Sequence, residues 1–214
     1  MKFEKKAVIF DLDGVICSTD EYHYQAWKQL ADRLGIYFDK AINNRLRGVS
    51  RMASLEIILE KADRSFTMEE KETLAGEKNE NYRGLLKNMT PGDVAEQVRD
   101  TLCALREKGY LLAIGSSSKN TKFILSRIGL DGFFDAVADG TDITRSKPDP
   151  EVFLTAAQKL GMAPADCAVV EDAKAGIQAA KAAGMTALAL FGDAKDCGLE
   201  DYALRSFDDL LNVL

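Results

Sequence analysis

The chain opens with an unbroken apolar run, Ala7 to Phe10, that passes directly into Asp-Leu-Asp-Gly at positions 11–14. A short apolar run of this kind is typical of a strand buried on both faces of a parallel sheet. Packing does not explain two carboxylates at its end, because burying an unpaired carboxylate is costly. Open α/β sheets bind ligands at the carboxyl ends of their strands. Asp11 and Asp13 are therefore candidates for a catalytic or metal site, with an ordinary acidic turn as the alternative.

Length and charge restrict the class of protein. The 214 residues suffice for one core plus a smaller accessory domain. With 28 basic and 34 acidic residues the net charge is −6, which argues against nucleic acid or an anionic membrane as a partner. One histidine and four widely separated cysteines argue against a zinc site. The sequence shows no leader-type or membrane-spanning run, so we expect a cytoplasmic monomer with free thiols.

The periodicity of apolar residues divides the chain into two regions. Residues 18–88 predict helices only, at 21–34, 51–61 and 67–86, with Ser50 and Thr67 as N-cap residues. From residue 94 onward helices alternate with short apolar strands, which we place at 111–114, 134–138, 168–170 and 186–190. This alternation predicts an α/β fold with a doubly wound parallel sheet. We therefore expect a Rossmann-like core domain at 1–17 and 89–214, interrupted by an inserted all-helical domain at 18–88.

Chemically useful residues follow three further strands. Gly115-Ser-Ser-Ser-Lys-Asn120 suits a phosphate, Lys147 precedes a proline, and Glu171-Asp172 ends another strand. Taken singly, these are equally a helix cap, a solvated loop lysine and an acidic helix start. However, the carboxyl ends of parallel strands share one edge of the sheet, so all four groups converge there. Four acids together require a cation, and an all-oxygen set beside a phosphate indicates Mg²⁺.

In this order and spacing the motifs resemble those of the haloacid dehalogenase (HAD) superfamily, and the resemblance covers essentially the whole chain. It implies that Asp11 is a nucleophile that forms an aspartyl-phosphate and that Asp13 is the general acid and base. It implies Mg²⁺ held by Asp11, the main-chain carbonyl of Asp13, Asp172 and Glu171. Ser116 and Lys147 are then expected to bind the transferring phosphoryl group. The dehalogenases of the superfamily lack the second acid of the first motif, so Asp13 indicates phosphate chemistry.

The helical region resembles the cap domain of those superfamily members that isomerise β-D-glucose 1-phosphate to D-glucose 6-phosphate through a 1,6-bisphosphate. The resemblance implies that the sugar phosphate contacts residues of both regions, namely His23, Trp27, Gly48, Val49, Ser50, Arg51, Lys78, Ser117, Ser118, Lys119 and Asn120. Among these, Arg51 and the Ser118–Asn120 segment are expected to hold the phosphate that is not being transferred. Without the resemblance, Trp27 reads as core, Gly48 as a helix stop, and Arg51 and Lys78 as solvated charges.

Two alternatives to the isomerase remain. One is a sugar-phosphate phosphatase with the same aspartyl-phosphate chemistry and water as the acceptor. The other is a non-catalytic binding protein with this fold, against which the intact Asp11, Asp13, Lys147 and Asp172 argue. Ser18 and Arg47 depart from the residues that the resemblance leads us to expect, an acid and a lysine respectively.

Overall fold

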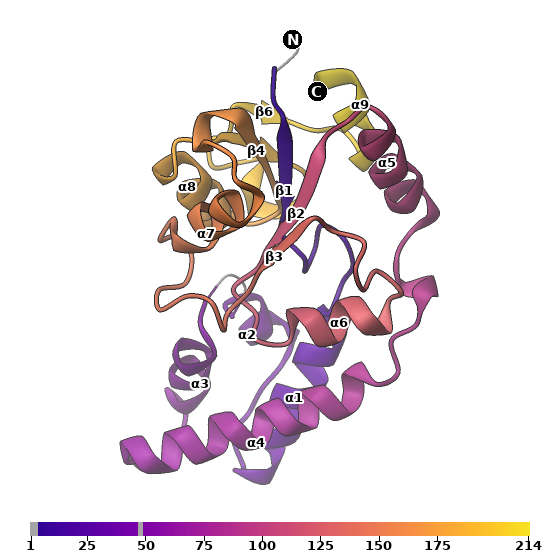
Figure 1. Cartoon of the computed structure of the whole chain (residues 1–214). Helices are drawn as coiled ribbons and strands as arrows, with labels where there is room; N and C mark the ends of the chain where they lie inside the picture. The colour runs from indigo at the N-terminus through magenta and orange to yellow at the C-terminus, as the bar shows by residue number, and fades with distance from the viewer. Residues whose placement is uncertain (1–3, 47–48) are drawn as a thin grey trace. The chain divides into compact units, whose positions relative to one another are not determined.

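A computed structural model describes residues 4–46 and 49–214. The chain divides into two compact units, which we call the core unit (Met1–Ser18 with Thr90–Leu214) and the helical unit (Thr19–Met89). Each of these boundaries lies one residue from the corresponding domain boundary expected from the sequence. Figure 1 shows the strands gathered in the core unit and α1–α4 in the helical unit.

The core unit is built on one six-stranded sheet in the order β3-β2-β1-β4-β5-β6, and every pairing is parallel. The expected doubly wound sheet is confirmed. Its strands are β1 (Ala7–Phe10), β2 (Leu111–Gly115), β3 (Ala136–Ala138), β4 (Cys167–Glu171), β5 (Thr186–Ala189) and β6 (Tyr202–Ala203). All four residues of β1 are fully buried between β2 and β4, which explains why this segment is apolar without alternation.

Helices cover both faces of this sheet. The helices of the core unit are α5 (Glu96–Glu107), α6 (Thr121–Arg127), α7 (Glu151–Leu160), α8 (Lys174–Ala182) and α9 (Leu210–Val213). Figure 1 shows α7 and α8 on one face of the sheet and α5 and α9 on the other. Beneath α7 and α8 lies a core rich in alanine, with Phe153 as its largest member. The small side chains let these two helices lie close to the strands.

The helical unit contains α1 (Asp20–Arg33), α2 (Lys40–Asn44), α3 (Arg51–Leu59) and α4 (Met68–Leu86). The expected N-caps are confirmed: the Ser50 hydroxyl accepts a hydrogen bond from Ala53 N, and Thr67 forms a capping box with Glu70. The α1 and α4 helices pack together, and Trp27, Leu30, Leu55 and Ile58 lie in the apolar core of the unit.

The structure corrects three details of the expected secondary structure. The short α2 begins where Asp39 caps Ile42 N at 2.8 Å, a polar signal that the apolar periodicity did not include. The two-residue β6 was not expected, and β3 begins at Ala136 rather than at Phe134, whose ring instead packs 6.4 Å from that of Phe10. In the described part of the chain, no helix is long and apolar enough to cross a membrane, and all four cysteines are free thiols.

Candidate active site

A buried lysine connects the ends of two neighbouring strands. Lys147 Nζ donates to Asp11 Oδ1 after β1 and, at 2.6 Å, to Glu171 Oε1 at the end of β4. The Lys147 side chain is only 8% exposed, and its ammonium lies 4.6 Å from the ring centroid of Phe153 on α7. Burial lowers the pKa of Lys147, but the two carboxylates outweigh it and raise that pKa above its ordinary value. Lys147 is therefore a permanent cation beside Asp11.

Carboxylates outnumber cations at this edge of the sheet. Burial, followed by the charges of Asp11, Glu171 and Asp13, raises the pKa of Asp172 to about 8. Burial also raises the pKa of Glu171, against the opposing effect of Lys147. Within residues 4–46 and 49–214 no three acidic, histidine or cysteine side chains are arranged to hold a metal ion. The site thus has an excess of negative charge but no ready-made set of ligands in this arrangement.

Two glycines make room for the carboxylates. A Cβ on Gly14 would overlap the Asp172 carboxylate, and one on Gly176 would overlap that of Glu171. Gly14 also has a φ of +87°, a left-handed conformation that other residues rarely adopt. Glu171 is further fixed because its Oε2 accepts hydrogen bonds from Asp172 N and Ala173 N. These contacts explain physically why a glycine follows the first acidic pair and another lies in the first turn of α8.

The serine-rich segment after β2 forms a compact loop ahead of α6. The hydroxyl of Ser116 accepts from Ser118 N at 3.2 Å, and the hydroxyl of Ser118 accepts from Asn120 N at 3.1 Å. Ser116 and Asn120 are buried, whereas Lys119 is exposed. The Ser117 hydroxyl is buried and has no hydrogen-bond partner among the described residues, which leaves it able to bind a ligand atom.

A second cluster, in the helical unit, joins α1 to α4. Lys78 is 2% exposed, and its Nζ lies 2.8 Å from His23 Nδ1. The same ammonium lies 4.6 Å from the ring centroid of Trp27 and 4.5 Å from that of Tyr82, within the range of cation–π attraction. Burial, followed by the charges of Lys78 and Arg51, lowers the pKa of His23 well below its ordinary value. His23 is therefore neutral and accepts a hydrogen bond from the Lys78 ammonium through Nδ1.

The other residues of the helical unit that are predicted to bind the sugar phosphate differ in their burial and in their free hydrogen-bonding groups. Arg51 opens α3 and is half-buried, and this burial lowers its pKa. Val49 is exposed, while the Ser50 hydroxyl is occupied as the cap of α3. Trp27 belongs to the apolar core as well as to the lysine cluster. Gly48 and Arg47 lie outside the described residues.

The structure adds two residues that the sequence analysis did not select. Tyr82 stacks on His23 with ring centroids 4.1 Å apart, and Asp139 is almost fully buried directly after β3. Asp139 satisfies the same criterion that selected Asp11, an acid at a strand end, and that criterion identifies it from the sequence. Tyr82 gives no such signal, because it lies 59 residues beyond His23 in the chain and only the packing of α1 on α4 joins them.

Two hollows on the helical unit are separate from the cluster around Lys78 and His23. One, of about 630 Å³, is lined by residues between Glu56 and Lys71, and the other, of about 310 Å³, is lined by residues between Arg33 and Leu74. Phe66 lines both. Neither hollow contains a residue predicted to bind substrate.

The chain is similar to proteins of known activity. Residues 5–184 match the family model of the haloacid dehalogenase-like hydrolases. A beta-phosphoglucomutase from Bacillus subtilis is 44% identical over 96% of this chain and 91% of its own length. A phosphorylated carbohydrates phosphatase from Thermotoga maritima is 32% identical over 84% of this chain and 82% of its own length. Among solved structures, the beta-phosphoglucomutase of Clostridium difficile superposes with a TM-score of 0.87 at 37% identity, covering 96% of this chain and 93% of the other.

Proposed function

The chain belongs to the haloacid dehalogenase-like hydrolase family, and we propose that it is a phosphosugar mutase that converts β-D-glucose 1-phosphate into D-glucose 6-phosphate. The observation that carries this proposal is the 44% identity to a beta-phosphoglucomutase over nearly the full length of both chains. The enzyme is then an isomerase that transfers a phosphoryl group from one oxygen of the sugar to another. The lysine-bridged carboxylates of the core unit supply groups suited to that chemistry.

In the proposed first step, a carboxylate oxygen of Asp11 attacks phosphorus in β-glucose 1,6-bisphosphate. A P–O bond to Asp11 forms, the P–O bond to the sugar breaks, and Asp13 gives its proton to the departing sugar oxygen. In the second step the hydroxyl of a glucose monophosphate attacks the aspartyl-phosphate while Asp13 takes back a proton. The cationic Lys147 offsets the negative charge of the phosphoryl oxygens, and Ser116 donates to them.

The donor atoms of the site suit a divalent cation by their chemistry, although the described side chains are not arranged as a ready set of ligands. The carboxylate and carbonyl donors are all oxygens, and a bound cation offsets both the burial and the mutual repulsion of the carboxylates, which together raise the pKa of Asp172. We assign Mg²⁺ to Asp11, the main-chain carbonyl of Asp13, Asp172 and Glu171. When bound, the ion supplies positive charge to the phosphoryl group and so lowers the barrier to its transfer.

The sugar is assigned to the helical cluster and the serine-rich loop. His23 is neutral with its proton on Nε2, so it can donate one hydrogen bond to a sugar oxygen or a carboxylate. Lys78 and Trp27 are assigned to the sugar as well, with Gly48, Val49 and Ser50 beside them. Arg51 provides a planar pair of donors suited to a phosphate that is held without being cleaved. Ser118, Lys119 and Asn120 complete that second phosphate site, and Ser117 lies between it and Ser116 in the chain.

The substrate class is a sugar phosphate, in agreement with the activities named for the relatives. We propose that the protein acts as a cytoplasmic monomer with no nucleic acid or membrane partner. A phosphatase is the second candidate, and the 32% identity to a phosphorylated carbohydrates phosphatase favours it specifically. The two candidates differ only in whether water or a sugar hydroxyl attacks the aspartyl-phosphate.

A coupled assay separates these candidates. Purified enzyme is given β-glucose 1-phosphate, Mg²⁺ and a trace of the 1,6-bisphosphate, while glucose 6-phosphate and inorganic phosphate are followed in parallel. The mutase produces glucose 6-phosphate in a manner that depends on the bisphosphate and releases little phosphate. Phosphate release without isomerisation would replace the mutase by the phosphatase. Loss of both products in Asp11→Asn is expected in either case.

A further inference from the structure

The turn from Asp139 to Asp142, directly after β3, is built around a buried carboxylate. Asp139 is 1% exposed, and its Oδ1 accepts hydrogen bonds from Thr141 N at 2.8 Å and from Thr141 Oγ1 at 2.5 Å. Asp142 in turn accepts from Asp139 N at 3.0 Å. A buried carboxylate held by two local donors fixes the backbone of a turn, because moving it would leave the charge unsatisfied.

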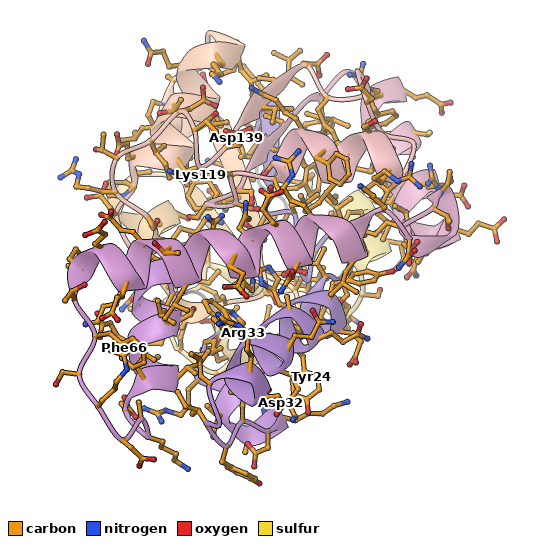
Figure 2. The ribbon with its side chains drawn as sticks, turned by 90° about the horizontal axis from the view of Figure 1, so that it is seen from below. Tyr24, Asp32, Arg33, Phe66, Lys119 and Asp139 are labelled. Carbon is orange, nitrogen blue, oxygen red and sulfur yellow. The ribbon has the colours of Figure 1, made fainter. Side chains whose placement is uncertain are left out.

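This turn lies directly against the serine-rich loop. Gly140 N donates to Ser118 O at 3.1 Å, and two residues earlier in each segment Ser116 N donates to Ala138 O at 3.1 Å. A Cβ on Gly140 would overlap the carbonyl oxygen of Ser117 and would lie 2.9 Å from Lys119 N. Figure 2 shows Asp139 and Lys119 as neighbours in the core unit.

The Ser118 carbonyl is held from two sides. Besides Gly140 N, it accepts from Thr121 Oγ1 at 2.9 Å, so the peptide unit that joins Ser118 to Lys119 has a fixed orientation. That peptide determines where the Lys119 side chain leaves the backbone. Lys119 is exposed, so its backbone is the part of the residue that this turn fixes, and a shift of the peptide moves the whole side chain with it.

We propose that Asp139 and Gly140 are positioning residues. The turn that they form holds the Ser118–Lys119 peptide and so positions the groups that bind the phosphate that is not being transferred. The assignment of Lys119 to that phosphate rests on the proposed function. Neither Asp139 nor Gly140 contacts a reacting atom, so their effect is on sugar-phosphate binding rather than on the phosphorylation of Asp11. Displacement of a binding group by about 1 Å is enough to lower activity by up to about a hundredfold.

The test compares two reactions of the full-length enzyme. Isomerisation needs both phosphate sites, whereas phosphorylation of Asp11 by acetyl phosphate needs only the site of transfer. In Gly140→Ala we expect the KM for β-glucose 1-phosphate to rise about ten- to a hundredfold, with the rate of Asp11 phosphorylation within about twofold of the wild type. Lys119→Ala is expected to give the same separation. An equal loss in both reactions would overturn the inference, because a merely structural role affects both.

A second pair of variants does not depend on the fit at Gly140. Asp139→Asn keeps one oxygen to accept from Thr141 and is expected to retain a KM near that of the wild type. Asp139→Ala loses that acceptor and is expected to raise the KM as Gly140→Ala does. The matched control is Lys122→Ala, which removes the cation 3.7 Å from Asp139 Oδ2 without touching the loop. A KM in Lys122→Ala as high as that in Asp139→Ala would contradict the proposal.

The design separates this inference from the proposed function. If the wild type releases phosphate without isomerising the sugar, the proposed mutase fails, and the same variants are compared through the KM of phosphate release. If the wild type isomerises and Gly140→Ala and Asp139→Ala both keep a normal KM, the mutase stands and the positioning role of the turn is wrong.

Discussion

Buried ionisable side chains form two sets of opposite charge. The core unit gathers Asp11, Asp13, Glu171 and Asp172 around the single ammonium of Lys147. The helical unit buries Lys78 beside neutral His23 and two aromatic rings, with half-buried Arg51 close enough to affect the pKa of His23. An excess of carboxylates attracts a cation, and an excess of buried cationic groups attracts an anion. The proposed reaction, a metal-assisted transfer on an anionic sugar phosphate, needs groups of both kinds.

The neutral state of His23 predicts a pH dependence of stability. The folded pKa lies well below the unfolded value of about 6.5, so the unfolded chain binds an extra proton between these two pKa values. The contribution of His23 to the free energy of unfolding is therefore fully present above the unfolded pKa. Below that pKa it decreases by up to about 1.4 kcal/mol for each pH unit of acidification, until the folded pKa is reached.

This pH effect is measured by comparing the wild type with His23→Gln in urea unfolding between pH 7 and pH 5. The variant is expected to lose less stability over that range, because glutamine does not bind the extra proton. His23 is the only histidine in the chain, so its imidazole NMR signals are unambiguous. A folded-state signal that titrates near pH 6.5 would contradict the assignment of a neutral, Nε2-protonated ring.

Gly176→Ala tests the fit around Glu171. The new Cβ would overlap the Glu171 carboxylate, which must then leave Lys147. We expect kcat to fall by about a hundredfold, with the fold retained. The matched control is Gly76→Ala in α4, where the glycine has open space around it. There alanine is expected to raise the free energy of unfolding by up to about 1 kcal/mol, with activity unchanged. Equal activity in the two variants would show that Glu171 does not depend on this glycine.

At the scale of helices and strands, the elements that the sequence predicts are those with a local signal. The buried run of β1, the Ser50 cap and the Thr67 capping box depend on residues within a few positions of one another, and all are confirmed. The pairing of His23 with Lys78 joins residues 55 positions apart and depends on the packing of α1 on α4. Short elements such as α2 and β6 are not predicted, because an element of two to five residues is too short to show a periodic pattern of apolar residues.

The capping box predicts a local effect of Thr67→Ala. The Thr67 hydroxyl accepts from Glu70 N, and without it that N–H at the start of α4 loses its partner. We expect the free energy of unfolding of the helical unit to fall by about 1 kcal/mol. We also expect the amide hydrogens in the first turn of α4 to exchange faster. Thr73→Ala, on the exposed face of the same helix, is the control and should cause no such loss. Unchanged exchange in the first turn of Thr67→Ala would show that Glu70 alone caps the helix.

At the scale of the whole molecule, each unit has its own apolar core, and the chain passes between the units only twice, after Ser18 and after Met89. The change from helical periodicity to alternating strands predicted this division, because each unit has a distinct pattern of apolar residues. The patterns do not predict which residues of each unit share a substrate. That assignment comes from the resemblance to known enzymes and stays a proposal.

The division into two units predicts that isomerisation and phosphorylation of Asp11 respond differently when the apolar core of one unit is disrupted. Leu55 is fully buried in the helical unit, and Leu55→Ala is expected to destabilise that unit by about 2–5 kcal/mol. Isomerisation should then fall, because the proposed sugar-binding residues lie there. Phosphorylation of Asp11 by acetyl phosphate should persist, because its carboxylates and Lys147 belong to the core unit.

Leu112→Ala is the matched variant, with the same substitution at a fully buried position of β2 in the core unit. It is expected to lower both reactions, since β2 leads directly into the serine-rich loop and pairs with β1. Amide hydrogen exchange on each full-length variant locates the loosened unit independently of activity. If Leu55→Ala abolishes phosphorylation of Asp11 as completely as isomerisation while β1 and β4 keep their protection, the core unit does not carry the first chemical step alone.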